Sequence, residues 1–385
     1  MRAWTILLFT VMSFWVLMIY YTIVPKLVGV DIPMSKDLDI SYITDALVGV
    51  TMINFGFWMA IYLLYPFAIR RVISSQATLV RNYASQNSPL VSIIIPARNE
   101  EDVIKRTITS CLEQSHRNIE VLVVCHNCSD NTFATAQFHD NRVRVFDLRT
   151  EAVGKSIALN YALGNSNGEY ILVLDADGIL DNNFIANALP LFGKGYAAVQ
   201  GKIMASNRDF NTMTRLLSLE GDLFSVPFMT VRSFLDKRTP LGGTGVIIRK
   251  DVLVKVGEFK NELIDDFELS FRLFRAKYRI AFAPMSVVYD EKPPNFKLLF
   301  NQRSRWVRGH IDLLRSRVAE PRDIFGNIYW LSPIFASCGF SLICISSFAI
   351  MFYVLYGYYP YTFSFLPIGL WFAPVSYTHL TLPTN

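Results

Sequence analysis

Short apolar runs alternate with polar, helix-forming stretches between residues 91 and 174, and this alternation constrains the fold more than any other feature. Four runs predict strands, at 91–96, 119–125, 143–147 and 170–174. Helices are predicted between them at 131–138, at 154–163 and after Asn99, which we expect to cap a helix that begins with Glu100. This alternation predicts an α/β fold with a mainly parallel sheet, helices on both faces and right-handed crossovers.

The pattern becomes less regular beyond residue 177, where three further elements are predicted. They are a strand near 197–202, a helix near 212–224 and a glycine-rich turn at 242–245. Sheets of this kind bind their ligands outside the carboxyl ends of the strands. We therefore expect the functional residues to follow the first, second and fourth strands.

Four long apolar runs account for the hydrophobic excess of a chain in which 52% of the 385 residues are hydrophobic and only 18% are charged. The runs cover approximately residues 4–25, 46–68, 328–356 and 361–375. A helix needs about 20 apolar residues to cross a bilayer, so we expect a multi-pass integral membrane protein. A cleaved signal peptide is the alternative for the first run, but that run is long for one and lacks a clear small-residue cleavage site.

Three arginines, Arg70, Arg71 and Arg81, follow the second run and place that side of the membrane in the cytoplasm. The expected location is the plasma (inner) membrane, with the large central domain cytoplasmic. The predicted parts are a two-helix transmembrane hairpin (1–69), a cytoplasmic domain (70–294), an amphipathic interfacial helix (295–325), a C-terminal transmembrane region (326–375) and an atypical polar tail (376–385), which suggests truncation.

The net charge of +5 comes from basic residues beside the apolar runs and between Arg303 and Arg322. This distribution favours an anionic membrane surface or a phosphate as partner, and we expect no nucleic acid. The five cysteines form no disulfide framework, as expected for a reducing compartment. Cys125 and Cys128 flank His126 like half of a zinc site, but no second pair of ligands follows at a usable spacing.

Asp175 and Asp177 stand one residue apart at the end of the fourth predicted strand, directly before Gly178. Two carboxylates at this spacing can bind one hard cation, which would neutralise a diphosphate. The alternative is a turn in which Asp175 caps a helix.

Asp265 and Asp266 begin a predicted amphipathic helix, where helix-dipole preferences alone favour acids. Crowded carboxylates can also raise one pKa, which suits a group that takes a proton from a hydroxyl. Further along, Gln302, Arg305 and Trp306 combine an amide, a guanidinium suited to phosphate and an aromatic plane suited to a sugar ring. An interfacial helix with a membrane-belt tryptophan is the alternative, and both can hold together.

Six motifs recur in the order found in one known family. They are Ile95-Pro96-Ala97-Arg98-Asn99-Glu100, Asn127-Cys128-Ser129-Asp130-Asn131-Thr132, Gly154-Lys155-Ser156-Ile157-Ala158-Leu159-Asn160, Asp175-Ala176-Asp177, Asp265-Asp266-Phe267-Glu268-Leu269 and Gln302-Arg303-Ser304-Arg305-Trp306. The chain therefore resembles the membrane-embedded inverting glycosyltransferases of family 2, which include hyaluronan, chitin, cellulose and poly-N-acetylglucosamine synthases. The resemblance covers roughly residues 89–314 and implies a GT-A type fold.

The resemblance also implies a role for each motif residue. Asp175 would contact a nucleotide sugar and, with Asp177, the metal, normally Mg2+ or Mn2+. Asp266, beside Asp265, would be the base that deprotonates the acceptor hydroxyl.

The remaining implied substrate-binding residues are Lys155, Asn99, Asp130, Gln302, Arg305 and Trp306. Lys155 would lie near the nucleotide, and the last three would hold the diphosphate and the acceptor sugar. Two departures from the family stand out: His126 replaces an aspartate that reads uracil, and Ile264-Asp265-Asp266 replaces Thr-Glu-Asp. The first leaves the nucleotide base open, although a UDP-sugar is the first expectation.

Three functions fit these residues. The first is elongation of a β-linked polysaccharide at the membrane, and the second is transfer of one sugar to a lipid acceptor. The third is a non-catalytic nucleotide-sugar-binding regulator, which only His126 favours. Three convincing spans are few for a polymer channel, so a longer carboxyl end or a homo-oligomer would have to supply more.

Overall fold

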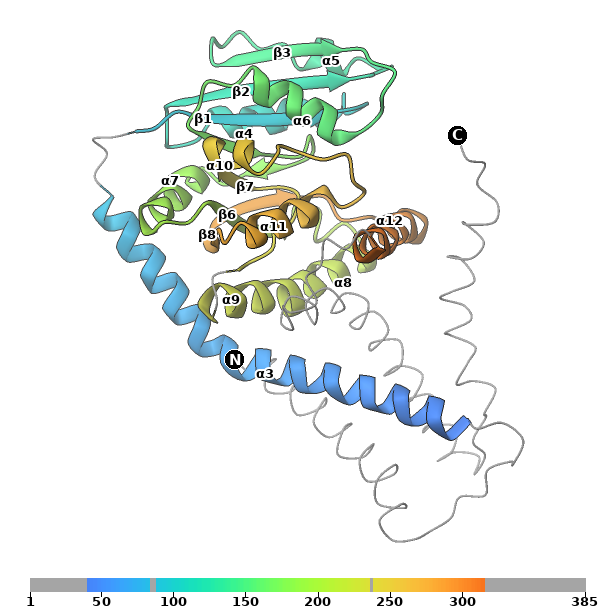
Figure 1. Ribbon diagram of the computed structural model, residues 1–385. Helices are drawn as coiled ribbons and strands as arrows, with labels where there is room; N and C mark the ends of the chain where they lie inside the picture. Colours follow the sequence, from blue (N-terminus) through green and yellow to red (C-terminus); the bar gives the residue numbers. More distant parts are fainter. Residues whose placement is uncertain (1–39, 84–87, 236–237, 316–385) are drawn as a thin grey trace, which may run out of the picture. The chain divides into compact units, whose positions relative to one another are not determined.

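The computed structural model describes residues 40–83, 88–235 and 238–315, with side chains of the first helix described from residue 58 onward. Contacts divide the chain into Met1–Met52 and Ile53–Asn385, and the description below concerns the second unit. Its centre is one sheet, which Figure 1 shows as a stack of strands with helices packed against it.

In the described part of the chain, eight strands form this sheet in the order β3-β2-β1-β4-β7-β6-β8-β5. Their bounds are β1 Val91–Ala97, β2 Ile119–His126, β3 Val143–Leu148, β4 Tyr170–Val173, β5 Ile179–Leu180, β6 Ala198–Ala205, β7 Val246–Arg249 and β8 Ile280–Asp290. The strands β1 to β4 are parallel to one another, as the alternating sequence predicts. All four predicted strands of this half are confirmed.

The second half corrects the expectation of a mainly parallel sheet. β7 lies antiparallel to both β4 and β6, and β5 lies antiparallel to β8, whereas β6 and β8 are parallel. The sheet is therefore mixed. The reason is that β4 and β7 are not joined by a single crossover helix: several elements lie between them in sequence, and the chain returns in the opposite direction.

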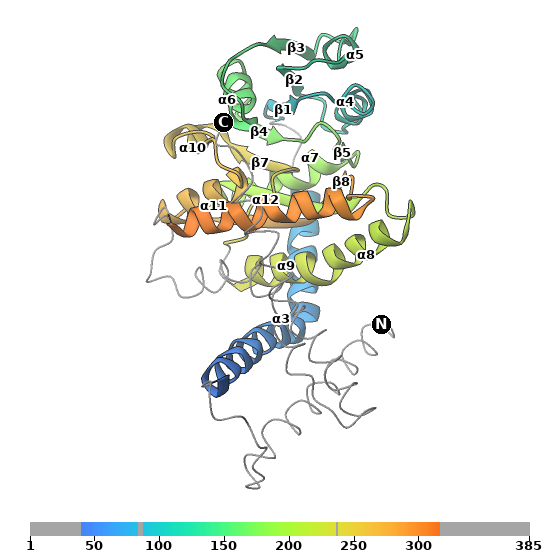
Figure 2. The same ribbon diagram turned by 90° about the vertical axis from the view of Figure 1, so that its right-hand side faces the viewer.

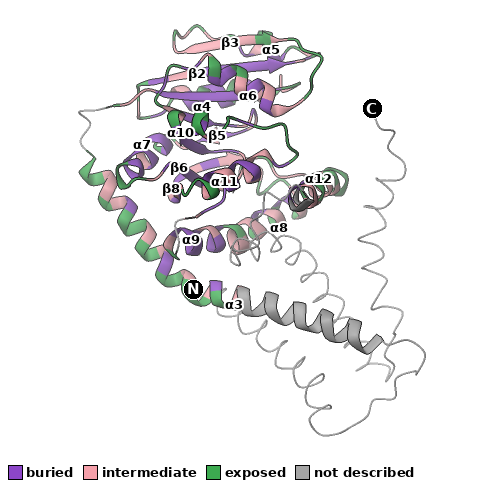
Figure 3. Cartoon of the chain, viewed as in Figure 1, coloured by how far each residue is buried: buried purple, intermediate pink, exposed green. Residues whose placement is uncertain are grey.

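Helices cover both faces of the sheet, as predicted. One face carries α4 (Ile104–Leu112), α7 (Phe184–Ala188) and the 3-10 helix η1 (Leu189–Lys194). The other carries α6 (Lys155–Gly164), α10 (Lys250–Lys255) and α11 (Asp265–Arg275). The period-two pattern of β1 explains this arrangement, because Ile93 and Ile95 join the first cluster and Ile94 joins the second. All three side chains are fully buried, and Figure 3 shows the same burial along β1 and β2.

The predicted helix after Asn99 begins later than expected. α4 starts at Ile104, and residues 101–103 form a turn. Asn99 has a φ of 58°, which is left-handed, and its Oδ1 accepts a hydrogen bond from Ser129 N at 2.8 Å. The side chain that we expected to cap the helix therefore links two loops. Farther along, the predicted helix at 131–138 shortens to α5 (Thr132–Thr135).

The remaining helices lie outside the two main layers. α8 (Thr212–Glu220), the π-helical turn η2 (Gly221–Ser225) and α9 (Val226–Leu235) follow one another, and Asn211 caps α8 through a capping box with Thr214. Phe228 and Val231 of α9 pack against Ile61 of α3 (Ile40–Asn82). α12 (Phe296–Arg315) matches the predicted amphipathic helix as far as the described residues extend.

Within the described ranges, no helix combines the length and the apolar character that crossing a membrane requires. The predicted run at 46–68 falls on α3. The runs at 4–25, 328–356 and 361–375, and the polar tail at 376–385, lie outside the described residues.

Candidate functional site

The glycine-rich turn at 242–245 folds around the aspartate that follows β4. Asp175 N donates to Thr244 Oγ1 at 3.1 Å, and Gly245 N donates to Val173 O at 2.9 Å. Gly243 has a φ of 79°, a conformation that side chains with a Cβ rarely adopt. The antiparallel pairing of β4 with β7 brings this turn to the carboxyl end of β4, where the sequence places the site.

Lys155, the first residue of α6, points its ammonium group at the same place. Its Nζ lies 2.5 Å from Asp175 Oδ1 and 3.2 Å from Gly243 O. Burial alone would lower the pKa of Lys155, but the carboxylates of Asp175, Asp265 and Asp266 raise it above its usual value. Lys155 is therefore a fixed cation between the predicted donor-binding aspartate and the predicted base.

Asp265 and Asp266 begin α11, as the sequence predicts. Asp266 Oδ1 accepts a hydrogen bond from Phe267 N at 2.9 Å. Burial, followed by the charge of Asp265, raises the pKa of Asp266 from 3.8 to about 7, while Lys155 opposes this shift. Burial likewise raises the pKa of Asp265. A carboxylate that titrates near neutral pH is suited to take a proton from a hydroxyl.

Asp177 lies in a second acidic group on the other side of Asp175. Burial and the charges of Asp175 and Asp290 raise the pKa of Asp177 from 3.8 to about 6. Burial and the charges of Asp177 and Asp175 raise the pKa of Glu100 from 4.5 to about 7. Besides burial, these acids therefore raise one another's pKa.

Asp290 is the acid of this group that the sequence did not single out. It ends β8, and the antiparallel register Ile179↔Tyr289 places it across from Gly178, next to Asp177. Asp290 Oδ1 is buried and forms an ion pair with Lys292 Nζ at 2.8 Å. An aspartate at a strand end was the available signal, but only the strand pairing shows that it is close to Asp177.

The donor set fits a divalent metal. In the described residues, no three His, Cys, Asp or Glu side chains form a ready-made cage. Mg2+ is usually bound by one or two carboxylates and completes its shell with waters and substrate phosphates. Asp175 and Asp177, with the buried Oδ1 of Asp290 nearby, supply such a partial set, and the charges of Asp175 and Asp290 add to burial in raising the pKa of Asp177.

Two predicted substrate-binding residues are occupied by contacts within the protein. Asp130 accepts hydrogen bonds from Thr132 N at 3.0 Å and from Glu101 N at 3.3 Å, and it thereby holds the loop after β2 against the loop after β1. Asn99 bonds to the same loop through Ser129. The structure thus gives both residues a loop-linking role, and their contact with a substrate stays a prediction.

The three predicted clamp residues lie on α12. Trp306 is 37% exposed, and the Arg303 guanidinium stacks on its ring at 4.5 Å from the centroid. Arg303 also forms an ion pair with Glu220 of α8 at 2.5 Å. For Gln302 and Arg305, no contact with the acids is found among the described residues. Arg303, which we did not predict, therefore links Trp306 to α8.

α12 crosses in front of α11 in the view of Figure 2, and side chains of α12 and of the start of α11 are in contact. Leu313 packs with Ile264 and Phe271, and Ile264 directly precedes Asp265. A Cβ added to Gly309 would lie 2.8 Å from the Ile264 side chain, so the glycine allows the two helices to approach closely. This contact places the helix of the predicted clamp beside the predicted base.

Gly309→Ala is expected to separate these two helices. The added methyl group must displace Ile264, and such overpacking typically lowers the free energy of unfolding by about 1–3 kcal/mol. Gly164→Ala is the matched control, because its added Cβ would meet nothing within 4 Å. Denaturant unfolding of both variants measures the difference. Equal stability of the two variants would show that the contact does not matter.

His126 ends β2 and is buried. Its Nε2 lies 2.8 Å from Thr150 Oγ1, whose hydroxyl donates to Ala152 O at 2.9 Å. Because that hydroxyl proton is already used, the geometry fits Nε2 as the donor of this pair. Cys125 and Cys128 beside it are buried free thiols.

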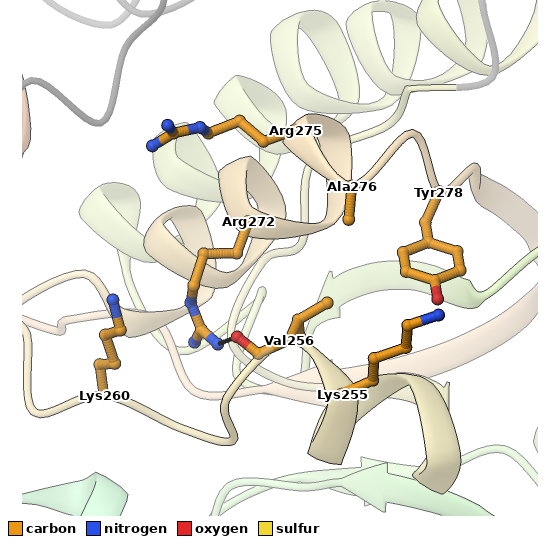
Figure 4. A pocket seen from close by; sticks show the side chains of 7 residues that line it. All are labelled: Lys255, Val256, Lys260, Arg272, Arg275, Ala276 and Tyr278. Atoms are coloured by element: carbon orange, nitrogen blue, oxygen red, sulfur yellow. Dashed lines mark hydrogen bonds between the residues drawn. The ribbon is translucent and has the colours of Figure 1, made fainter.

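A separate hollow of about 430 Å3 lies at the opposite end of α11, in its last turn. Lys255, Lys260, Arg272 and Arg275 line it together with Val256, Ala276 and Tyr278. Figure 4 shows that the four cationic side chains do not converge: Arg275 points away, and Arg272 bonds to Val256 O. A much smaller cavity of about 20 Å3 lies directly beside Asp265 and Asp266.

Comparison with known proteins adds a family match. The model of the family described as "Glycosyltransferase like family 2" matches residues 88–309, more than half of the chain. The matched region contains all six motifs, the last of which ends at Trp306.

Three curated relatives illustrate the range of similar proteins. The probable glycosyltransferase YdaM of Bacillus subtilis is 30% identical over 58% of this chain and 55% of its own length. The beta-monoglucosyldiacylglycerol synthase of Trichormus variabilis is 31% identical over 57% and 49%. The poly-beta-1,6-N-acetyl-D-glucosamine synthase of Staphylococcus aureus is 25% identical over 58% and 56%. The chain thus spans about half the length of these relatives.

A solved structure supports the fold. The mannosyltransferase PcManGT from Pyrobaculum calidifontis, in complex with GDP-Man and Mn2+, aligns with 76% of this chain and 80% of its own. The TM-score is 0.51 and the sequence identity is 21%. This similarity concerns the arrangement of strands and helices.

Proposed function

The chain belongs to glycosyltransferase family 2, and we propose that it transfers a sugar from a nucleotide sugar, a UDP-sugar first of all, to an acceptor hydroxyl with inversion of the anomeric carbon. The observation that carries this proposal is Asp266. It is a carboxylate at the start of α11 whose pKa is raised to about 7, and it shares Lys155 with the donor-side aspartate Asp175. General bases work best when their pKa lies near the working pH.

The transfer is a single in-line displacement. The acceptor oxygen forms a bond with the anomeric carbon while the bond from that carbon to the diphosphate oxygen breaks. Asp266 takes the acceptor proton, and the diphosphate leaves with the bonding electron pair. Lys155, which is held by Asp175 Oδ1 and Gly243 O, offers a cation beside the leaving group.

Asp175 and Asp177 would hold the divalent metal, with Asp290 close by. Mg2+ or Mn2+ bound there would neutralise the charge that develops on the departing diphosphate. In the metal-free protein, burial and then the charges of Asp175 and Asp290 raise the pKa of Asp177. Arg305 and Trp306 remain the proposed contacts for diphosphate and acceptor, reached through the packing of α12 against α11.

For the acceptor, we propose a growing β-linked polysaccharide at a membrane. Trp306 is 37% exposed beside the predicted base helix, with Arg303 stacked on its ring, and it is the aromatic side chain that we propose for contact with a sugar ring. A diacylglycerol-type lipid is the second candidate, and it is supported by the 31% identity to a beta-monoglucosyldiacylglycerol synthase. Both acceptors agree with the proposal that the chain is a multi-pass protein of the plasma membrane with its catalytic domain in the cytoplasm.

Membranes containing the full chain are expected to release UDP from UDP-glucose or UDP-N-acetylglucosamine only when Mn2+ or Mg2+ is present. GDP-mannose in the same assay tests the nucleotide base that His126 leaves open. Sizing of the radiolabelled product distinguishes a polymer from a glycolipid that carries one sugar. Binding of UDP without release from any donor would instead indicate the non-catalytic regulator.

A further inference from the structure

The loop at 256–264 joins α10 to α11 and is fixed along α6. Asn160 on α6 pairs with the backbone of Phe259: its Nδ2 donates to the carbonyl at 2.8 Å, and its Oδ1 accepts from the amide at 3.0 Å. Arg272 on α11 donates to two further carbonyls of the loop. The loop is therefore held from both helices, and it leads directly into Asp265.

Asn261 is the residue by which this loop reaches the beginning of α6. Its Nδ2 donates to Val153 O, and its Oδ1 accepts from Ser156 Oγ, both at 3.3 Å. These two contacts lie on either side of the Gly154-Lys155 step. The amide of Asn261 thus bridges the turn from which the Lys155 side chain extends.

Gly154 makes this contact possible. A Cβ on Gly154 would lie 2.0 Å from Asn261 Oδ1 and 2.8 Å from its Cγ, so the space of a side chain at 154 is already filled by the amide. The backbone of Gly154 is extended, with a φ of 161°, which residues other than glycine also adopt. The glycine is therefore required by the close approach of Asn261.

We propose that Asn261 is a positioning residue that clasps the Gly154-Lys155 turn and holds the Lys155 ammonium in place for the diphosphate of the donor. This inference rests on the proposed function, because it assigns Asn261 a role at the proposed donor site. No sequence motif includes Asn261. The clasp also joins the two halves of the reaction. The same loop carries Asn261 and ends at the aspartates that begin α11.

Asn261→Ala is expected to raise the KM for the nucleotide sugar about tenfold and to change kcat less than about twofold, since the lost contact positions a donor-binding group. Gly154→Ala should cause a similar rise, because its methyl group displaces the amide. The double variant should be no worse than Asn261→Ala alone. This lack of additivity is the signature of a direct contact.

Asn165→Ala is the matched control. It removes an amide from the opposite end of α6, where Nδ2 donates to Tyr161 O at 2.8 Å, and it should leave KM unchanged. If Asn261→Ala and Asn165→Ala lower stability alike without changing KM, the amide is only structural and the proposal is wrong. Additive effects of Gly154→Ala and Asn261→Ala would also overturn it.

Failure of the proposed function gives a different result. In that case the unaltered chain itself releases no nucleotide from any donor. The contact can still be judged from unfolding of the full chain, in which Gly154→Ala should lower stability and the added Asn261→Ala should restore it. If the second substitution restores stability but the unaltered chain shows no turnover, the contact between Asn261 and Gly154 is real and its assigned role in donor binding is wrong.

Discussion

Asp266→Asn is expected to lower turnover about a thousandfold while leaving nucleotide binding within about twofold, because positioned general bases typically contribute 10²–10⁴ in rate. The amide keeps the size of the carboxyl group and an oxygen for the hydrogen bond from Phe267 N. Rates of UDP release and the affinity for UDP measure the two effects. Glu262→Gln is the control, since this exposed carboxylate lies in the loop that directly precedes α11.

The same variant tests the pKa of Asp266 through stability. Burial and Asp265 raise this pKa from 3.8 to about 7 in the folded protein, so the folded state binds the proton more tightly than the unfolded state does. The resulting stabilisation is complete below about pH 4 and is lost as the pH rises through about 7. In EDTA at pH 8, the free energy of unfolding of Asp266→Asn should therefore be about 1–3 kcal/mol higher than that of the unaltered protein.

Activity and stability then change in opposite directions. Activity of the unaltered enzyme should rise with pH up to about 7, as the base loses its proton. A variant that is both inactive and less stable at pH 8 would indicate misfolding rather than a missing base. Full activity of Asp266→Asn would show that another group takes the proton.

Asp177→Asn is expected to weaken Mn2+ binding at least about a hundredfold and to lower turnover by a similar factor. Loss of a group that only supports a metal ligand already costs 10–100-fold in affinity, and Asp177 is placed as a ligand itself. Mn2+ titration followed by electron paramagnetic resonance measures the affinity without requiring activity. Activity of the unaltered enzyme should also disappear in EDTA and return with Mn2+.

Asp209→Asn is the matched control for the metal experiment. The Asp209 side chain is 85% exposed and forms an ion pair with Arg215 at 3.5 Å. An ion pair this exposed contributes little to stability. Its replacement should leave both Mn2+ affinity and turnover unchanged. Equal affinity of Asp177→Asn and the unaltered protein would place the metal elsewhere.

The residues of the donor half could be predicted because local patterns determine them. Each of the first four strands is an apolar run that ends in polar residues, so Asp175 follows β4 as expected. Asp265 and Asp266 likewise begin a helix whose amphipathic period is visible in the sequence. Neither prediction depended on how distant segments pair.

The residues that the sequence did not reveal depend on such pairing. Asp290 approaches Asp177 only because β8 lies antiparallel to β5, and no local pattern specifies this register. Asn261 reaches Gly154 because Asn160 and Arg272 fix an irregular loop between them. Arg303 was overlooked because the spacing of the motif singled out its neighbours, whereas its contacts with Glu220 on α8 and with Trp306 depend on the fold.

The position of β7 between β4 and β6 also has a consequence for synthesis of the chain. A nascent chain completes β1 to β4 long before residues 246–249 emerge, and until then β4 is an unpaired, apolar sheet edge. Such edges recruit strands from other molecules. We therefore expect fragments that end before β7 to aggregate through β4, so that the glycine-rich turn and β7 protect the growing chain as well as shaping its finished site.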